Sequence, residues 1–207
     1  MFNYIGMFIV FEWVDGSGKD TQLNKVFEYL WERNKNLQIW KTKEPTDYTK
    51  HWKIILDKLK NGGFSTPEEA LELYVADREE QTDIRKNILK HSAVLCSRFD
   101  YTTYAYQWIS GLSFEEIKSA HNYDNIIIPD ITFVFDVNPD NIAKRLKNRW
   151  WKKEFFENIE FLQNANKAYL EVAEKLKSER KIYIIDANES IEKTFDKVKE
   201  VLDKYEF

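Results

Sequence analysis

Short runs of apolar residues recur along the chain and predict five buried β-strands. The runs are rich in β-branched and aromatic side chains. Because most of them are largely apolar instead of alternating regularly with polar residues, they are typical of strands covered on both faces, as in a parallel sheet. They span residues 7–11, 37–42, 93–97, 131–137 and 181–185.

Segments with the 3.6-residue period of helices separate these runs. Three of them begin with N-terminal signals: Thr66 followed by Pro67, Ser113 paired with Glu116 as a capping box, and Pro139. The predicted helices are 18–33, 66–91, one beginning at 113, 139–149, 155–178 and 190–205. Strands that alternate with helices predict a single α/β domain, a three-layer, doubly wound, five-stranded parallel sheet that binds ligands at the carboxyl ends of its strands.

A glycine-rich turn follows the first predicted strand and leads directly into a helix. Backbone N–H groups at such a turn and at a helix N-terminus point toward an anion, and a lysine adds a full positive charge. An ordinary turn that only caps a helix is the alternative. We expect the phosphates of a nucleoside triphosphate to bind to Asp15, Gly16, Ser17, Gly18, Lys19, Asp20 and Thr21.

Two positions depart from the usual phosphate-loop pattern G-x-x-x-x-G-K-[ST]. Trp13 stands where the first glycine belongs, and Asp20 stands where a hydroxyl residue normally binds Mg²⁺. Mg²⁺ prefers oxygen ligands and accepts a carboxylate as well as a hydroxyl. Asp20 is therefore the expected metal ligand.

The composition narrows the class of partner. The 207 residues carry a formal net charge of −4, so no overall positive field favours nucleic acid or a membrane surface. No apolar run is long enough to span a bilayer, and no cationic leader precedes the first strand. The single cysteine, Cys96, excludes an internal disulfide. We expect a cytoplasmic protein without nucleic-acid or membrane partners.

Five motifs, in order along nearly the whole chain, resemble those of the thymidylate kinases, a family of nucleoside-monophosphate kinases. They are Phe11-Glu12 with Asp15 to Lys19; Lys43-Glu44-Pro45; the run 71–78 that ends in Asp77-Arg78; Arg98-Phe99 with Thr102 and Gln107; and Pro129-Asp130 with Asp136, Arg145 and Arg149. The resemblance implies transfer of the γ-phosphoryl group of ATP to dTMP, dependence on Mg²⁺, and a homodimer.

The resemblance also implies roles for the matched residues on the acceptor side. Arg98 would bind the monophosphate with its guanidinium fork. Arg78 and Gln107 would read the pyrimidine edge, and Tyr74 would stack on the base. Lys43 and Thr102 would complete the substrate site, and Asp15 would accept a hydrogen bond from the sugar 3′-OH.

On the donor side, Lys19 would bridge the β- and γ-phosphates and Thr21 would contact the α-phosphate. Cations in and beside a lid at about 150–155 would stabilise the transferring group. These cations are Arg145, Arg149, Lys152 and Lys153. The implied catalytic residues are Lys19, Arg98, Asp15 and Arg149.

The chain departs from the family pattern at several of these positions. Ser97 replaces the usual aspartate, Phe99 a tyrosine and Lys43 an arginine, while Phe155 stands about where a lid arginine is expected. One acid is thus lost at position 97 and one gained at Asp20, which predicts that the carboxylate has moved within the metal shell.

Two alternatives stay open at this stage. One is a kinase for another deoxynucleoside or pyrimidine monophosphate. The other is a nucleotide-binding paralogue with weak or no activity, which Trp13, Asp20 and Ser97 favour.

Overall fold

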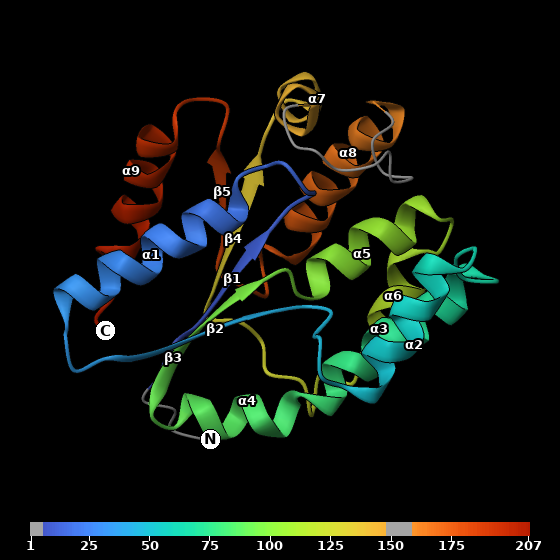
Figure 1. Cartoon of the computed structure of the whole chain (residues 1–207), viewed down its shortest axis with the longest axis horizontal. Helices are drawn as coiled ribbons and strands as arrows, with labels where there is room; N and C mark the ends of the chain where they lie inside the picture. The colour runs from blue at the N-terminus through green and yellow to red at the C-terminus, as the bar shows by residue number, and fades with distance from the viewer. Residues whose placement is uncertain (1–5, 148–158) are drawn as a thin grey trace.

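A parallel five-stranded sheet forms the centre of the protein, with the strand order β2-β3-β1-β4-β5 (Figure 1). The structure is a computed structural model and describes residues 6–147 and 159–207. The strands are β1 Phe8–Glu12, β2 Gln38–Lys43, β3 Ser92–Ser97, β4 Ile131–Asp136 and β5 Ile182–Asp186. All four pairings are parallel, which confirms the predicted fold class.

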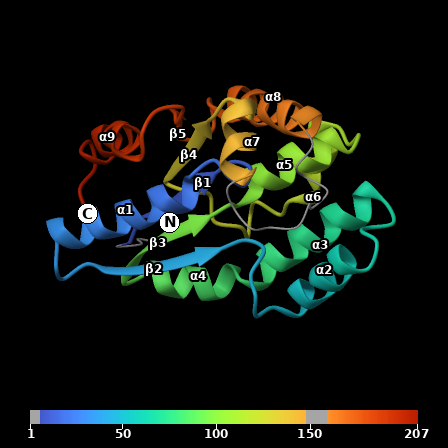
Figure 2. The same cartoon turned by 45° about the horizontal axis from the view of Figure 1, so that its top comes forward.

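Helices cover both faces of this sheet, as Figures 1 and 2 show. They are α1 Lys19–Arg33, α2 Lys50–Lys60, α3 Pro67–Glu80, α4 Thr82–Leu89, α5 Asp100–Ile109, α6 Phe114–Ala120, α7 Pro139–Lys147, α8 Ile159–Leu176 and α9 Ile191–Leu202. α1 and α9 pack on one face, while α4, α5 and α8 lie on the other (Figure 2). No helix of the described ranges is long and apolar enough to cross a membrane.

The central strand β1 is buried along its whole length. Phe11 packs against Phe133 and Phe135 of β4, with ring centroids 5.6 and 6.2 Å apart. Burial of each such side chain is worth about 1.5–3 kcal/mol relative to exposure. This packing holds the carboxyl end of β1, from which the glycine turn departs, in a fixed place.

The predicted helix over 66–91 is wrong in one respect, because the structure divides it into α3 and α4 at Gln81. Side chains form hydrogen bonds with the carbonyl groups at the break: Gln81 Nε2 donates to the carbonyl of Asp77, and Thr82 Oγ1 donates to the carbonyl of Arg78. Such local bonds compete with the regular helix ladder. The helices α2 and α5 were not predicted, although Thr49 caps α2 by accepting a hydrogen bond from the Trp52 N–H.

The strand order brings the predicted motifs to one edge of the sheet. β3 lies beside β1, with Ser97 in register with Phe11. Parallel neighbours end at the same edge, so the glycine turn after β1 and Arg98 after β3 meet there.

Candidate active site

The turn between β1 and α1 has the geometry of a phosphate-binding loop. Gly16 and Gly18 take φ values of 81° and 95°, a left-handed conformation that costs glycine little. α1 begins at Lys19, so the N–H groups of its first turn lie at the loop. Lys19 is only 3% exposed, and its Nζ lies 3.0 Å from Asp15 Oδ1.

Trp13, at the position of the usual first glycine, does not crowd this loop. Its side chain is fully buried, and its ring lies 4.8 Å from that of Tyr169 on α8. Its φ of 159° lies at the edge of the extended region. The tryptophan ring is therefore accommodated in the core beside α8.

Asp15 connects the phosphate loop to the end of β3. The same carboxylate oxygen, Oδ1, lies 3.0 Å from Lys19 Nζ and 2.7 Å from Arg98 Nη2. Desolvation raises the pKa of Asp15, but Arg98 and Lys19 together lower it more, so the net pKa lies below its usual value. The carboxylate therefore stays ionised and holds Lys19 and Arg98 close to each other. These two cations are predicted to bind different phosphates.

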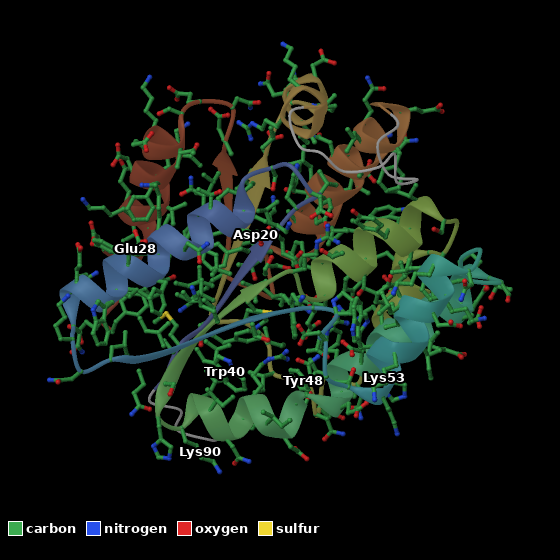
Figure 3. The ribbon with its side chains drawn as sticks, viewed as in Figure 1. Asp20, Glu28, Trp40, Tyr48, Lys53 and Lys90 are labelled. Carbon is green, nitrogen blue, oxygen red and sulfur yellow. The ribbon has the colours of Figure 1, made fainter. Side chains whose placement is uncertain are left out.

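Asp20 and Ser97 meet at the mouth of this loop. The Ser97 hydroxyl donates a hydrogen bond to the Asp20 carboxylate. The Asp20 side chain is 65% exposed, and Lys19 Nζ lies 3.4 Å from its Oδ2. Figure 3 shows Asp20 at the start of α1. This contact confirms that positions 20 and 97 face the same region.

Arg78, which is predicted to lie on the acceptor side, is held by several partners. It is buried, and each of its nitrogens has a partner: Nε lies 2.7 Å from Glu44, Nη1 2.8 Å from His121 and Nη2 3.0 Å from Thr103. Glu44 also binds Arg85 at 2.6 Å. The guanidinium therefore has one fixed orientation.

His121 helps to set that orientation. Its Nδ1 lies 2.7 Å from the Ile117 carbonyl and donates to it, which leaves Nε2 to accept from Arg78. Burial and the charge of Arg78 lower the pKa of His121 to about 4, so the imidazole is neutral near pH 7. The ring also stacks between Tyr104 and Tyr123, at 5.4 and 5.2 Å.

Gln107 and Tyr74 contribute further groups of the predicted base site. Gln107, on α5, is buried, and its Oε1 has no hydrogen-bond partner within the described residues. Tyr74, on α3, is half-buried, and burial raises its pKa to about 12 against the opposing charge of Arg98. An unpaired buried carbonyl is costly and is available to a donor on a ligand.

Thr102 and Lys43, also predicted to touch substrate, have protein partners in this structure, as Arg78, Arg98 and Asp15 do. The Thr102 hydroxyl lies 2.7 Å from both Glu12 Oε2 and the Tyr169 hydroxyl. Lys43 is 58% exposed and lies 3.5 Å from Asp47. Their direct contacts with substrate stay predictions, as does the α-phosphate contact of Thr21, which is half-buried in the first turn of α1.

Arg145 of α7 braces the phosphate loop from the other side. Its Nη1 donates to the Ser17 carbonyl at 2.8 Å, and its Nη2 donates to the Ala187 carbonyl at 3.0 Å. Burial lowers its pKa. The other predicted lid residues, Arg149, Lys152, Lys153 and Phe155, lie outside the described residues, as does the lid at 150–155.

Sequence reasoning missed three supporting residues of this site, Glu12, Glu44 and His121. Glu12 and Glu44 are part of the matched motifs. Glu12 is a charged residue at the end of an apolar strand, and that position could have indicated that its side chain is buried and has a specific role. His121 gave no such signal, because its link to Arg78 depends on how α3 and α6 pack.

Comparison with known proteins agrees with this geometry. The family model described as thymidylate kinase matches residues 11–198. The chain belongs to the thymidylate kinase family. A probable thymidylate kinase of Thermococcus kodakarensis is 32% identical, over 93% of this chain and 95% of its own length. A thymidylate kinase of Finegoldia magna is 36% identical over 95% and 97%. A probable thymidylate kinase of Methanocaldococcus jannaschii is 37% identical over 82% of both chains. Family membership makes the protein a nucleoside-monophosphate kinase, a phosphotransferase.

Proposed function

We propose that the protein transfers the γ-phosphoryl group of ATP to dTMP and produces dTDP and ADP. One observation carries the proposal: Lys19 of the phosphate loop and Arg98 after β3 lie 3.0 and 2.7 Å from one oxygen of Asp15. The cation that suits the donor triphosphate and the cation that suits the acceptor monophosphate are thereby neighbours. In-line transfer between two phosphates requires this proximity.

The chemistry needs positioning and charge neutralisation more than a strong base. A phosphate oxygen of dTMP attacks the γ-phosphorus, and the bond to the β–γ bridging oxygen breaks as ADP leaves. Lys19 offsets charge on the donor phosphates, and the Arg98 fork orients the acceptor phosphate. Asp15, whose side chain is 72% exposed, accepts a hydrogen bond from the sugar 3′-OH.

The preference for thymine follows from the buried polar groups. The unpaired Oε1 of Gln107 accepts a hydrogen bond from the N3–H of thymine. Arg78, in the orientation fixed by Glu44 and His121, donates to the O4 edge. Tyr74 supplies a half-buried ring on which the base stacks. Cytosine lacks the N3–H and carries a donor in place of O4, so it leaves Gln107 Oε1 unpaired and places a donor against the Arg78 guanidinium.

The groups at the loop mouth fit Mg²⁺, which keeps several water ligands and binds proteins through one or two carboxylates together with substrate phosphates. Asp20 presents an exposed carboxylate, oriented by the Ser97 hydroxyl, and the described residues contain no cluster of three metal-binding side chains that would form a complete protein cage. Asp20 would hold the ion, which shields the negative charge of the triphosphate. Arg145 and Arg149 would contact the donor nucleotide.

We further propose a homodimer in the cytoplasm. The resemblance to the family is the main support. On α2, Ile54 and Leu59 are exposed apolar side chains that a second copy would cover. Light scattering coupled to size exclusion distinguishes the dimer from a monomer.

A Mg²⁺-dependent assay of ADP release with a panel of monophosphates tests the function. Turnover that is greatest with dTMP supports it. Equal or greater turnover with another pyrimidine monophosphate would favour the alternative kinase, and nucleotide binding without ADP release would favour the inactive paralogue.

A further inference from the structure

Glu12 is a buried carboxylate beside the acceptor site that the reaction as described does not use. It is the last residue of β1 and is fully buried. Both donors that the structure gives it are neutral: the Phe99 N–H at 2.7 Å and the Thr102 hydroxyl at 2.7 Å. A charged group in such a place is costly unless it is paired and hydrogen-bonded.

The donor Phe99 N–H follows a strained residue. Arg98 has a φ of 64°, the left-handed region that side chains other than glycine rarely adopt, at a cost of about 1–3 kcal/mol. Its own N–H donates to the Phe11 carbonyl at 2.9 Å, and the next N–H, that of Phe99, donates to Glu12. Two consecutive residues of β1 therefore hold two consecutive N–H groups of the turn after β3.

This turn decides where the Arg98 side chain lies. With the backbone in the left-handed conformation, the guanidinium reaches Asp15 Oδ1 at 2.7 Å. The second partner of Glu12 extends the support, because Thr102 lies in the first turn of α5 and contacts Tyr169 of α8. Figure 2 shows α5 and α8 side by side near the carboxyl end of β1.

We propose that Glu12 is a positioning residue for acceptor binding. Its carboxylate oxygen accepts the hydrogen bond of the Phe99 N–H and so keeps Arg98 in the turn that presents the Arg98 guanidinium to the monophosphate. This inference rests on the proposed role of Arg98. If it is correct, acceptor binding depends on the length of the Glu12 side chain and not on its charge.

The protonation of Glu12 agrees with that distinction. Burial raises its pKa to about 7, against the opposing hydrogen bonds from Thr102 and Phe99. A protonated carboxyl group keeps one carbonyl oxygen that accepts from Phe99. Glutamine reproduces this neutral form with the same length, whereas aspartate keeps the charge but is one methylene too short.

The matched variants are therefore Glu12→Asp and Glu12→Gln, measured by calorimetry for dTMP and, separately, for ADP. We expect Glu12→Asp to raise the Kd for dTMP about tenfold or more, the effect of leaving a buried donor unpaired. Glu12→Gln should restore the Kd to within about threefold of the wild-type value. The Kd for ADP should stay unchanged in both. Val198→Ala, at a buried position of α9 on the other face of the sheet, controls for a general loss of stability and should leave both Kd values unchanged.

Several outcomes overturn the proposal. One is the reverse ranking, with glutamine damaging and aspartate tolerated, which would make charge the decisive property. Others are unchanged dTMP affinity in Glu12→Asp, a parallel loss of ADP affinity, or a Glu12→Asp protein that does not fold, which would assign Glu12 to the fold. A wild-type protein that binds no dTMP would instead refute the proposed function itself.

Discussion

The Ser97 hydroxyl donates a hydrogen bond to the Asp20 carboxylate, and the bond joins the last residue of β3 to the first turn of α1. The family pattern places a hydroxyl after the phosphate-loop lysine and a carboxylate before the acceptor arginine. In this chain the two groups have exchanged positions and remain in contact. We expect this carboxylate and this hydroxyl at the loop mouth to bind one shared metal ion.

Removal of the Asp20 carboxylate should increase the Mg²⁺ requirement. We expect Asp20→Ala to raise the Mg²⁺ concentration for half-maximal activity and to weaken the binding of Mg·ADP, but not of metal-free ADP, in calorimetry. The double variant Asp20→Thr with Ser97→Asp should recover the wild-type values, and the two changes should be non-additive because they share one ion. Tighter ATP binding by Asp20→Ala at saturating Mg²⁺ would show instead that Asp20 only repels the triphosphate.

Lys19→Met should abolish phosphoryl transfer and leave the fold intact. Lys19 is a buried cation at the loop, and stabilisation of transition-state charge of this kind is worth about 10²–10³ in rate or more. Lys25→Met on the same helix, where Lys25 pairs loosely with Glu192 at 3.9 Å, is the matched control and should keep its activity. Turnover and thermal melting check both variants. More than a tenth of wild-type turnover in Lys19→Met would contradict the assignment.

Arg98→Ala should impair the acceptor and spare the donor. Loss of one member of a charge-assisted pair costs on the order of 2–5 kcal/mol, so we expect a higher KM for dTMP and a lower kcat. The Kd for ATP should change little. Weaker ATP binding with intact dTMP binding would move Arg98 to the donor site and reverse the proposed orientation of the two substrates.

The base preference should depend on Gln107. The wild type should favour dTMP over dCMP, because cytosine leaves buried polar groups unpaired at about 1–3 kcal/mol. Gln107→Leu should reduce kcat/KM for dTMP and narrow the ratio between the two substrates. Steady-state kinetics with both monophosphates measure this ratio, and equal wild-type kcat/KM values would refute the pocket as described.

His121 should make stability depend on pH on the acid side. Its pKa falls from the usual 6.5 to about 4 in the folded protein, so the unfolded state binds a proton more readily between these values. The stabilising contribution is therefore complete above pH 6.5 and is lost as the pH falls through 4, up to about 3 kcal/mol.

Denaturant unfolding of the wild type and His121→Gln between pH 4 and 8 measures this contribution. Glutamine keeps an acceptor for Arg78 but does not titrate, so the difference in unfolding free energy between the two proteins should shrink as the pH falls. A difference that stays constant with pH would contradict the neutral, buried state of His121.

Local patterns predicted much of this fold, and the reason is physical. The predicted runs matched the five strands within about a residue or two. β1, β3 and β4 are buried on both faces, and such burial leaves a signal in each segment alone. The prediction that all five strands are buried was wrong for β2 and β5, which lie at the edges of the sheet and are largely exposed or half-exposed. The order β2-β3-β1-β4-β5 leaves no such signal. The division of the predicted helix 66–91 at Gln81 was also not predicted, because it depends on side-chain hydrogen bonds to the carbonyl groups of Asp77 and Arg78.

The site divides in the same way. Asp15 and Lys19 lie within one turn of chain, so their proximity followed from the motif, and the meeting of Asp20 with Ser97 followed from the family pattern. The contacts of the supporting residues did not follow from any motif. Glu12 contacts Phe99, 87 positions later, and Arg78 contacts Glu44 and His121, 34 and 43 positions away. Contacts of that separation depend on tertiary packing, which no local pattern records.

The central claim is transfer from ATP to dTMP, and the most direct measurement is ADP release by the wild-type protein with ATP, Mg²⁺ and dTMP, with Lys19→Met as the background. The account predicts ADP release that requires both dTMP and Mg²⁺, yields dTDP in equal amount, and disappears in Lys19→Met. Binding of both nucleotides in calorimetry, with ADP release no greater than that of Lys19→Met, would contradict it.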